Sequence, residues 1–218
     1  MTKTKSVIYT ILTGLPLVAT LVSLFFMPET VAVHFDINNQ VDRWGSKYEL
    51  LILPIVALVM GIVLIISAKR IDKKENSGNN NYKVFTTVGI VILAVFNIIT
   101  YYILYIGFTN AQTLDNMQID IYSLLVLMFG VMFVIIGNIM PKIRTNHLLG
   151  IRNKWTKSSE IVWKKAHRVG GFISIFTGLI AIVASFVFSG QVSIIILIGL
   201  LLVNAVVTTI YSYVVSKK

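Results

Sequence analysis

Apolar residues fill long stretches of this chain, and charged residues fall almost entirely between them. Charge-free runs extend over residues 6–28, 50–68, 84–114, 121–141 and 169–216. A helix needs about 20 apolar residues to cross the hydrocarbon core of a bilayer. The last run is long enough for two such helices, and Ser189-Gly190-Gln191 predicts a turn between them. We therefore predict transmembrane helices near residues 6–26, 49–68, 84–106, 120–140, 169–188 and 192–214.

The apolar runs show no alternation of apolar and polar residues, which the strands of a membrane barrel require. They predict an all-α fold, a polytopic membrane protein built as a bundle of six transmembrane helices. Composition agrees, because 56% of the 218 residues are hydrophobic and 13% are charged, whereas a soluble domain carries about 25% charged residues. The chain has no cysteine, which excludes disulfides and thiolate metal sites.

The distribution of basic residues predicts how the helices are oriented. Of the 19 Lys and Arg residues, 17 fall on one side of the predicted membrane, and only Arg43 and Lys47 fall on the other. Basic residues are enriched in cytoplasmic loops. We therefore place both termini and the loop at 141–168 in the cytoplasm. The same rule accounts for the net charge of +10 without any nucleic-acid partner.

Three parts of the chain are expected from the lengths of the loops. Residues 1–75 form a two-helix module with an extracellular loop at 27–48. Residues 76–83 form a polar linker, because residues 76–81 are rich in Gly and Asn. Residues 84–218 form a four-helix module with a cytoplasmic amphipathic loop at 141–168.

The outer loop contains a short alternating pattern from Val31 to Asp36, which indicates an extended segment. Asn38-Asn39 then predicts a turn. Two interpretations stay open, a surface that meets an extracellular ligand and a folded hairpin that caps the helices. In the first, the contacts would come from His34, Phe35, Asp36, Asp42 and Arg43. His34 and Asp36 have no third ligand near them in the sequence, so no metal site is expected.

The inner loop contains features of both helix termini and membrane interfaces. Pro141 is expected to end the fourth helix, and Thr156 to cap a helix that has Glu160 in its first turn. A helical wheel over residues 157–168 places Trp163 on an apolar face and His167 on a polar one. This pattern favours a helix lying in the membrane interface, with Trp155 and Trp163 among lipid headgroups. A docking surface for a cytoplasmic protein and a small-molecule site are the alternatives.

Polar residues are rare inside the predicted helices. Asn97, Asn138 and Asn204 are expected to form hydrogen bonds between helices. No charged residue lies near a helix midpoint, which argues against a proton-coupled pump. Hydrolase, metalloprotease and nucleotide-binding motifs are missing, and we therefore expect neither an enzyme nor a cofactor. The glycines of the helices are expected to allow close packing: Gly61, Gly89, Gly130, Gly178 and Gly199.

The residues of the inner loop follow a spaced pattern: Gly137-Asn138-x-Met140-Pro141-Lys142, Asn146, Gly150-Ile151-Arg152, Trp155-Thr156, Glu160, Trp163, His167-Arg168 and Gly170. This pattern resembles the hallmark of the SdpI family, named for immunity to the sporulation-delaying protein toxin of bacilli. The segment from Pro28 through His34-Phe35 and Asp42-Arg43 to Pro54 is similar to a two-helix domain that often precedes it. Many relatives have Thr-Pro-Trp-Thr at 153–156, where this chain has Asn153-Lys154, and the loss of proline predicts a looser turn.

The resemblance implies a multi-pass protein of the bacterial cytoplasmic membrane that protects its cell from a secreted, membrane-active toxic peptide. The member after which the family is named also captures a winged-helix repressor, so a toxin-responsive receptor is an alternative. A small transporter or lipid-modifying enzyme is a further one. The expected partners are membrane lipid, the toxic peptide and a cytoplasmic repressor. The resemblance assigns the family motif to Asn138, Pro141, Lys142, Asn146, Gly150, Arg152, Trp155, Thr156, Trp163 and His167.

Overall fold

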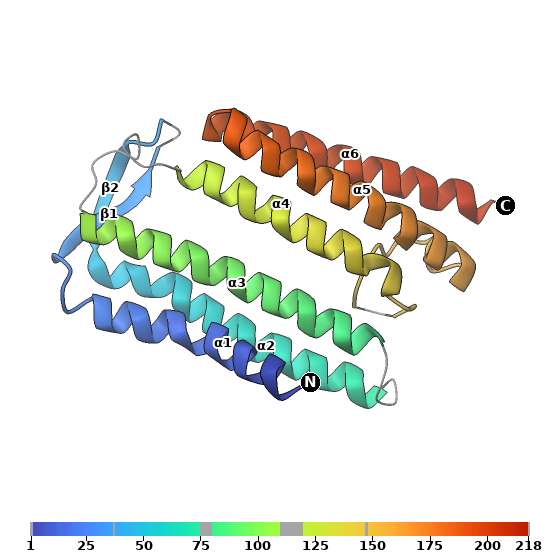
Figure 1. Cartoon of the computed structure of the whole chain (residues 1–218), viewed down its shortest axis with the longest axis horizontal. Helices are drawn as coiled ribbons and strands as arrows, with labels where there is room; N and C mark the ends of the chain where they lie inside the picture. Colours follow the sequence, from blue (N-terminus) through green and yellow to red (C-terminus); the bar gives the residue numbers. More distant parts are fainter. Residues whose placement is uncertain (1, 37, 75–79, 110–119, 147, 218) are drawn as a thin grey trace. The chain divides into compact units, whose positions relative to one another are not determined.

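Six long helices make up most of the chain in the computed structural model, which describes residues 2–36, 38–74, 80–109, 120–146 and 148–217. Within these residues, all six are long and apolar enough to cross a membrane. The prediction of an all-α, six-helix membrane protein is therefore confirmed. The helices are α1 (Lys3–Ser23), α2 (Ile52–Lys74), α3 (Asn80–Thr109), α4 (Ile121–Ile139), α5 (Glu160–Val187) and α6 (Gly190–Ser216) (Figure 1).

The chain divides into two compact units, and the first comprises Met1–Arg70 and Thr86–Asp120. It holds α1, most of α2 and most of α3. The Nδ2 of Asn97 on α3 donates to the carbonyl oxygen of Leu12 on α1 at 2.7 Å, which confirms the interhelical hydrogen bond expected of Asn97. The compact units do not coincide with the predicted modules 1–75 and 84–218, because this bond ties α3 to the first helix.

The polar linker predicted at 76–83 is shorter than expected. Residues 80–83 form the first turn of α3, and residues 75–79 lie outside the described part of the chain. Asn81 is buried, and its Oδ1 accepts a hydrogen bond from the backbone N–H of Arg144 at 2.8 Å. The start of α3 thus belongs to the second unit, Ile71–Phe85 and Ile121–Lys218.

The outer loop is a folded hairpin that packs on its own unit. Strands β1 (Thr30–Phe35) and β2 (Val41–Ser46) are antiparallel, and Asn39 has a φ of 62° in the turn between them. Val31 packs in a buried cluster with Met27, Leu50 and Leu104, which joins the hairpin to the end of α3. A short 3-10 helix, η1 (Lys47–Leu51), then leads into α2.

Helices α4 and α5 of the second unit cross at two pairs of glycines. A Cβ atom on Gly137 would lie 2.5 Å from the carbonyl oxygen of Gly171, and one on Gly130 would lie 2.9 Å from that of Gly178. The glycines recur seven residues apart on both helices, so the two pairs form one seam along the antiparallel crossing. Small residues let membrane helices approach this closely, which confirms the packing role expected of Gly130 and Gly178. The packing role expected of Gly199 is wrong, because a Cβ there would meet nothing within 4 Å.

Helix α6 completes the second unit. Its Asn204 Nδ2 donates to Ser174 Oγ at 3.2 Å and to Thr177 Oγ1 at 3.3 Å, both on α5. The interhelical bonding predicted for Asn204 is thus confirmed. The predicted break at 189–191 is confirmed in position, because α5 ends at Val187 and α6 begins at Gly190.

The fifth helix differs from its prediction. The expected interfacial helix at 157–168 and the expected span at 169–188 form one continuous helix of 28 residues. Ser159, rather than Thr156, is its N-cap, and the Ser159 side chain accepts from the N–H of Val162. Gly170 and Gly171 lie buried at the start of the predicted span. Their lack of side chains serves close packing there and does not interrupt the helix.

Candidate functional site

Four of the five candidate residues on the outer hairpin are held by polar contacts within it. His34 Nδ1 lies 2.6 Å from Asp42 Oδ1 across the strands, and both side chains are exposed. Arg43 Nη1 lies 2.9 Å from Glu49 Oε2. Asp36 closes the turn instead of pairing with His34, because its Oδ1 accepts from the N–H of Asn38 and of Gln40, each at 2.9 Å.

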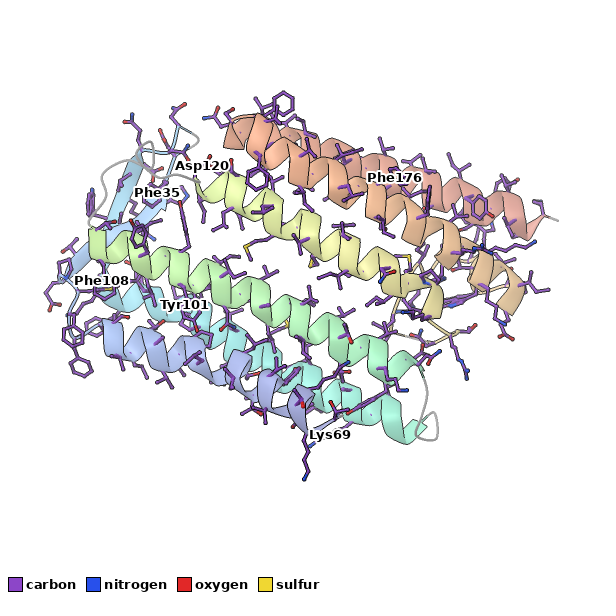
Figure 2. The ribbon with its side chains drawn as sticks, in the orientation of Figure 1. Phe35, Lys69, Tyr101, Phe108, Asp120 and Phe176 are labelled. Carbon is purple, nitrogen blue, oxygen red and sulfur yellow. The ribbon has the colours of Figure 1, made fainter. Side chains whose placement is uncertain are left out.

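The remaining candidate, Phe35, is half-buried at the end of β1. Figure 2 shows Phe35 on the hairpin and Phe108 near the end of α3, at the same end of the first unit. A further contact, not predicted from the sequence, anchors this hairpin. Lys47 is almost fully buried, and its Nζ contacts Glu29 Oε1 at 2.9 Å and the carbonyl oxygen of Met27 at 3.4 Å.

The hairpin region also presents aromatic side chains to its surroundings. Phe25 and Phe26, in the turn after α1, are 85% and 75% exposed. Trp44 on β2 and Tyr48 on η1 are exposed as well. Aromatic residues gather where a membrane protein meets the bilayer–water interface. The hairpin end of the first unit therefore combines exposed aromatic rings with exposed polar pairs.

The centre of the inner loop is a buried pair of rings, Trp163 and His167. Both side chains are 0% exposed, and their rings stack with centroids 4.2 Å apart. Trp163 Nε1 donates to the carbonyl oxygen of Ile143 at 2.9 Å. Trp163 therefore does not sit among headgroups and His167 is not on a polar face, because helix contacts and hydrogen bonds bury both.

The two ring nitrogens of His167 are both engaged. The N–H of Ile151 points at Nε2 at 3.0 Å, and since a backbone N–H can only donate, Nε2 is the acceptor. The ring proton is therefore on Nδ1, which donates to the carbonyl oxygen of Trp163 at 2.9 Å. His167 is a neutral bridge between α5 and the inner loop. It is not available as a base or as a metal ligand in this arrangement.

Two turns build the rest of the loop. Asn146 Oδ1 accepts from the N–H of Leu148 at 2.7 Å and of Leu149 at 2.6 Å. Asn153 Oδ1 accepts from the N–H of Thr156 at 2.8 Å, and Thr156 Oγ1 accepts from the N–H of Asn153 at 3.0 Å. The side chains of Asn153 and Thr156 therefore close the turn at 153–156, which contains no proline.

The other motif residues are more accessible. Asn138, Pro141, Lys142 and Arg152 are exposed. Trp155 is half-buried against Tyr213 of α6, with ring centroids 5.3 Å apart. The expected end of the fourth helix is confirmed, because α4 stops at Ile139 and a 3-10 turn, η2 (Met140–Lys142), carries the proline. His147 lies outside the described residues.

The motif residues thus fall into two groups. One group holds the backbone of the loop in place, and the other is exposed on its surface. Asn146, Gly150, Thr156, Trp163 and His167 hold the backbone through hydrogen bonds or close contact. The exposed motif residues include two cations, Lys142 and Arg152. Much of the pattern that carries the resemblance therefore specifies a rigid loop scaffold.

Gly150 offers a direct test of that scaffold. Its φ is +90°, and a Cβ there would collide with Nε2 of His167. We expect Gly150→Ala to cost about 1–3 kcal/mol of stability through backbone strain and to break the bond between His167 and Ile151. Thermal unfolding of the detergent-solubilised protein measures the loss. Gly199→Ala is the matched control, because a Cβ there meets nothing within 4 Å, and an unfolding temperature lowered equally by both would contradict the scaffold.

The chain is similar to known protein families and to two individual proteins. Residues 142–212 match the model of the SdpI/YfhL protein family, and residues 11–58 match a domain of unknown function (DUF1648). The chain is 26% identical to "Immunity protein SdpI" of Bacillus subtilis (strain 168) over 98% of its own length and 97% of that protein's. It is also 49% identical to an uncharacterized protein of Archaeoglobus fulgidus over 20% of this chain and 25% of that one. No solved structure matches.

Proposed function

Since the chain belongs to the SdpI family, we propose that it is an immunity protein, which protects the cell that makes it from a secreted, membrane-active toxic peptide. The observation that carries this proposal is the similarity to the immunity protein of Bacillus subtilis, which extends over 98% of this chain. Both the outer hairpin and the inner loop fall within that length. The protein is a multi-pass protein of the cell membrane.

The outer end of the first unit has the chemistry that a membrane-active peptide requires of a partner. Such peptides are amphipathic, with apolar and charged residues on opposite faces. Phe25 and Phe26 offer apolar contact, the ion pair Arg43–Glu49 offers charges of both signs, and the His34–Asp42 pair offers a polar ring and a carboxylate. Exposed ion pairs contribute only about 0–1 kcal/mol. They can therefore exchange their partners for charges of a peptide at little cost.

We infer that protection works by binding and not by catalysis. Of the histidines that the structure describes, His167 has both ring nitrogens committed to hydrogen bonds, and His34 is paired with Asp42 in the hairpin. In this mechanism the peptide is held at the outer end of the helices before it disrupts the bilayer. No cofactor and no chemical step is needed.

The test is survival of a toxin-sensitive bacterium that expresses this chain and is exposed to the sporulation-delaying protein toxin. We expect the wild type to protect, and His34→Ala combined with Asp42→Ala to reduce survival at least about tenfold, equivalent to about 1.4 kcal/mol of lost binding. The amount of protein in the membrane should not change, because the pair is exposed.

The matched control for this double variant is Glu160→Ala combined with Lys164→Ala. This pair is also exposed, with a separation of 2.8 Å, but it lies on the loop that we predict to be cytoplasmic. Protection should survive its removal. Loss of protection in the control alone would contradict binding at the outer hairpin.

A toxin-responsive receptor that sequesters a cytoplasmic repressor is the second candidate. One observation favours it, namely that the rigid inner loop and the start of α5 present exposed cations, including Arg152, Lys157, Lys165 and Arg168. A tagged winged-helix repressor should then move to the membrane when toxin is added. Replacing Lys157 and Lys165 with glutamine should abolish this movement and leave survival unchanged. Movement that is unaffected by the replacement would exclude this surface.

A further inference from the structure

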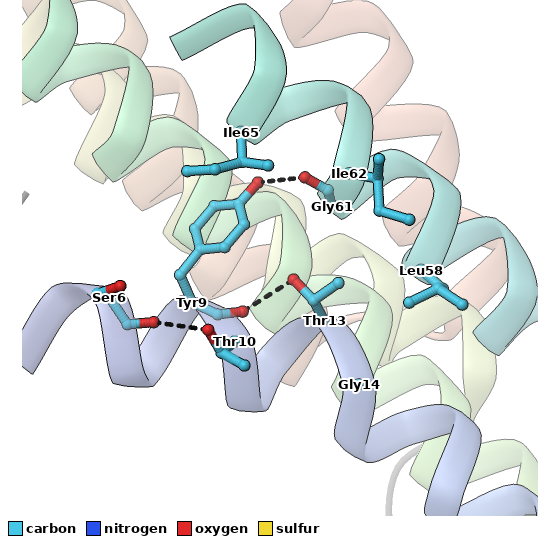
Figure 3. A pocket seen from close by; sticks show the side chains of 9 residues that line it. All are labelled: Ser6, Tyr9, Thr10, Thr13, Gly14, Leu58, Gly61, Ile62 and Ile65. Carbon is cyan, nitrogen blue, oxygen red and sulfur yellow. Dashed lines mark hydrogen bonds between the residues drawn. The ribbon is translucent and has the colours of Figure 1, made fainter. Parts of the chain in front are cut away.

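A groove runs between α1 and α2 in the first unit, on a part of the molecule that the immunity function does not use. Its volume is about 290 Å³. It is lined by residues between Ser6 and Gly14 of α1 and between Leu58 and Ile65 of α2 (Figure 3). The groove therefore faces the hydrocarbon layer that surrounds these two helices.

Three hydroxyl groups in the groove already donate hydrogen bonds to backbone carbonyl oxygens of the protein. Thr10 Oγ1 donates to the carbonyl oxygen of Ser6 at 3.0 Å, and Thr13 Oγ1 donates to that of Tyr9 at 2.8 Å. Tyr9 Oη crosses to α2 and donates to the carbonyl oxygen of Gly61 at 2.8 Å (Figure 3). A ligand therefore gains little from hydrogen bonding here, and the methyl and methylene groups of the lining favour a hydrocarbon chain.

Gly14 leaves one side of the groove open. A Cβ atom at Gly14 would meet no atom within 4 Å, whereas one at Gly61 would lie 2.5 Å from the Thr13 side chain. The two glycines thus act differently, because Gly61 lets the helices approach and Gly14 leaves space unfilled. An α-helix as long as this groove occupies on the order of 1,000 Å³. The volume therefore fits one flexible chain rather than an inserted helix.

Basic residues lie at one end of the groove. Lys3 precedes Ser6 by less than one turn of α1, and Lys69 and Arg70 follow Ile65 by about one turn of α2. All three side chains are exposed, and Figure 2 shows Lys69 extending away from the helices near the start of α1. Long basic side chains at helix ends reach toward phosphate groups at the membrane surface.

We propose that the groove between α1 and α2 is a binding site for an anionic phospholipid. One acyl chain lies along Gly14 and the apolar lining, and the headgroup phosphate lies at Lys3, Lys69 and Arg70. The negative headgroup fits the basic end of the site, and the hydrocarbon chain fits the apolar lining of the groove. This site is separate from the proposed immunity function, and either proposal can fail without the other.

Native mass spectrometry of the delipidated full-length protein, with added phosphatidylglycerol or phosphatidylcholine, tests the site. Wild type should retain phosphatidylglycerol more strongly than phosphatidylcholine. Lys69→Gln with Arg70→Gln should weaken phosphatidylglycerol binding about 30-fold, from the loss of two basic contacts. The same charge change at Lys157 and Lys165 is the control and should have no such effect. Equal retention of the two lipids by wild type would overturn the proposal.

A separate substitution tests the part of the site that binds the acyl chain. Gly14→Leu places a side chain in the groove, and its Cβ would meet nothing within 4 Å. We expect this variant to reduce binding of both lipids at least about tenfold. Gly199→Leu is the control, because its Cβ also meets nothing within 4 Å and it lies on α6, outside the groove. Wild-type binding by Gly14→Leu, or an equal loss in both variants, would show that the chain does not lie in this groove.

Discussion

Replacing Trp163 with alanine is expected to lower the free energy of unfolding by about 3–5 kcal/mol, the range for deleting a buried large aromatic side chain. The ring is 0% exposed and stacks on His167. Its loss would leave a cavity beside the histidine. It would also leave the carbonyl oxygen of Ile143 without its donor, in a place where water does not replace it easily.

Two further variants separate these contributions. Trp163→Phe keeps an aromatic ring beside His167 but removes the Nε1–H donor and part of the ring volume, so it should cost about 1–3 kcal/mol. Trp155→Ala is the matched control, because this tryptophan is half-buried and packs at the edge of Tyr213. It should cost about 1 kcal/mol. Denaturant titration of the solubilised protein measures all three, and a larger loss for Trp155→Ala than for Trp163→Ala would refute the assigned roles.

Gly178→Leu is expected to separate α4 from α5. A Cβ at this position would collide with the carbonyl oxygen of Gly130. Because the obstacle is backbone, no side-chain rotation can relieve the collision, and the helices themselves must move. We expect a loss of about 3 kcal/mol or more, at the upper end of the cost of overpacking, with less folded protein reaching the membrane.

Gly199→Leu makes the same chemical change on α6, where a Cβ meets nothing within 4 Å. It should leave the unfolding temperature close to that of the wild type. Fluorescence-detected size-exclusion chromatography after heating compares the two variants directly. If Gly178→Leu melted like Gly199→Leu, the glycine seam would not be the contact that holds α4 and α5 together.

The helices could be predicted from the sequence because hydrocarbon thickness sets their length and long apolar runs are unambiguous. The start of α5 could not be predicted from the sequence. Lys164, Lys165 and Arg168 lie within this helix, whereas charged residues usually mark the end of a transmembrane segment. The burial of His167 could not be predicted either, because a helical wheel assigns histidine to the polar face from its residue type alone. Its burial depends on the N–H of Ile151, which a loop far from it in the sequence supplies.

The candidate sites were predicted less completely than the fold. The alternation from Val31 to Phe35 and the turn at Asn38-Asn39 were enough to predict an extended segment and a turn. They did not reveal that His34 pairs with Asp42, because strand register decides which side chains face each other. The ion pair between Lys47 and Glu29 was missed for the same reason. The role of Asn153 was not predicted, because the residue pattern does not show the side-chain hydrogen bond that closes the turn at 153–156.

The membrane potential of toxin-treated cells tests the central claim most directly. A potential-sensitive dye would follow cells that express this chain, cells that express the His34→Ala and Asp42→Ala variant, and cells with an empty vector, after addition of the sporulation-delaying protein toxin. We predict that only the cells with the wild-type chain keep their potential. Depolarisation as fast as in empty-vector cells, with the wild-type chain present in the membrane, would contradict the immunity function.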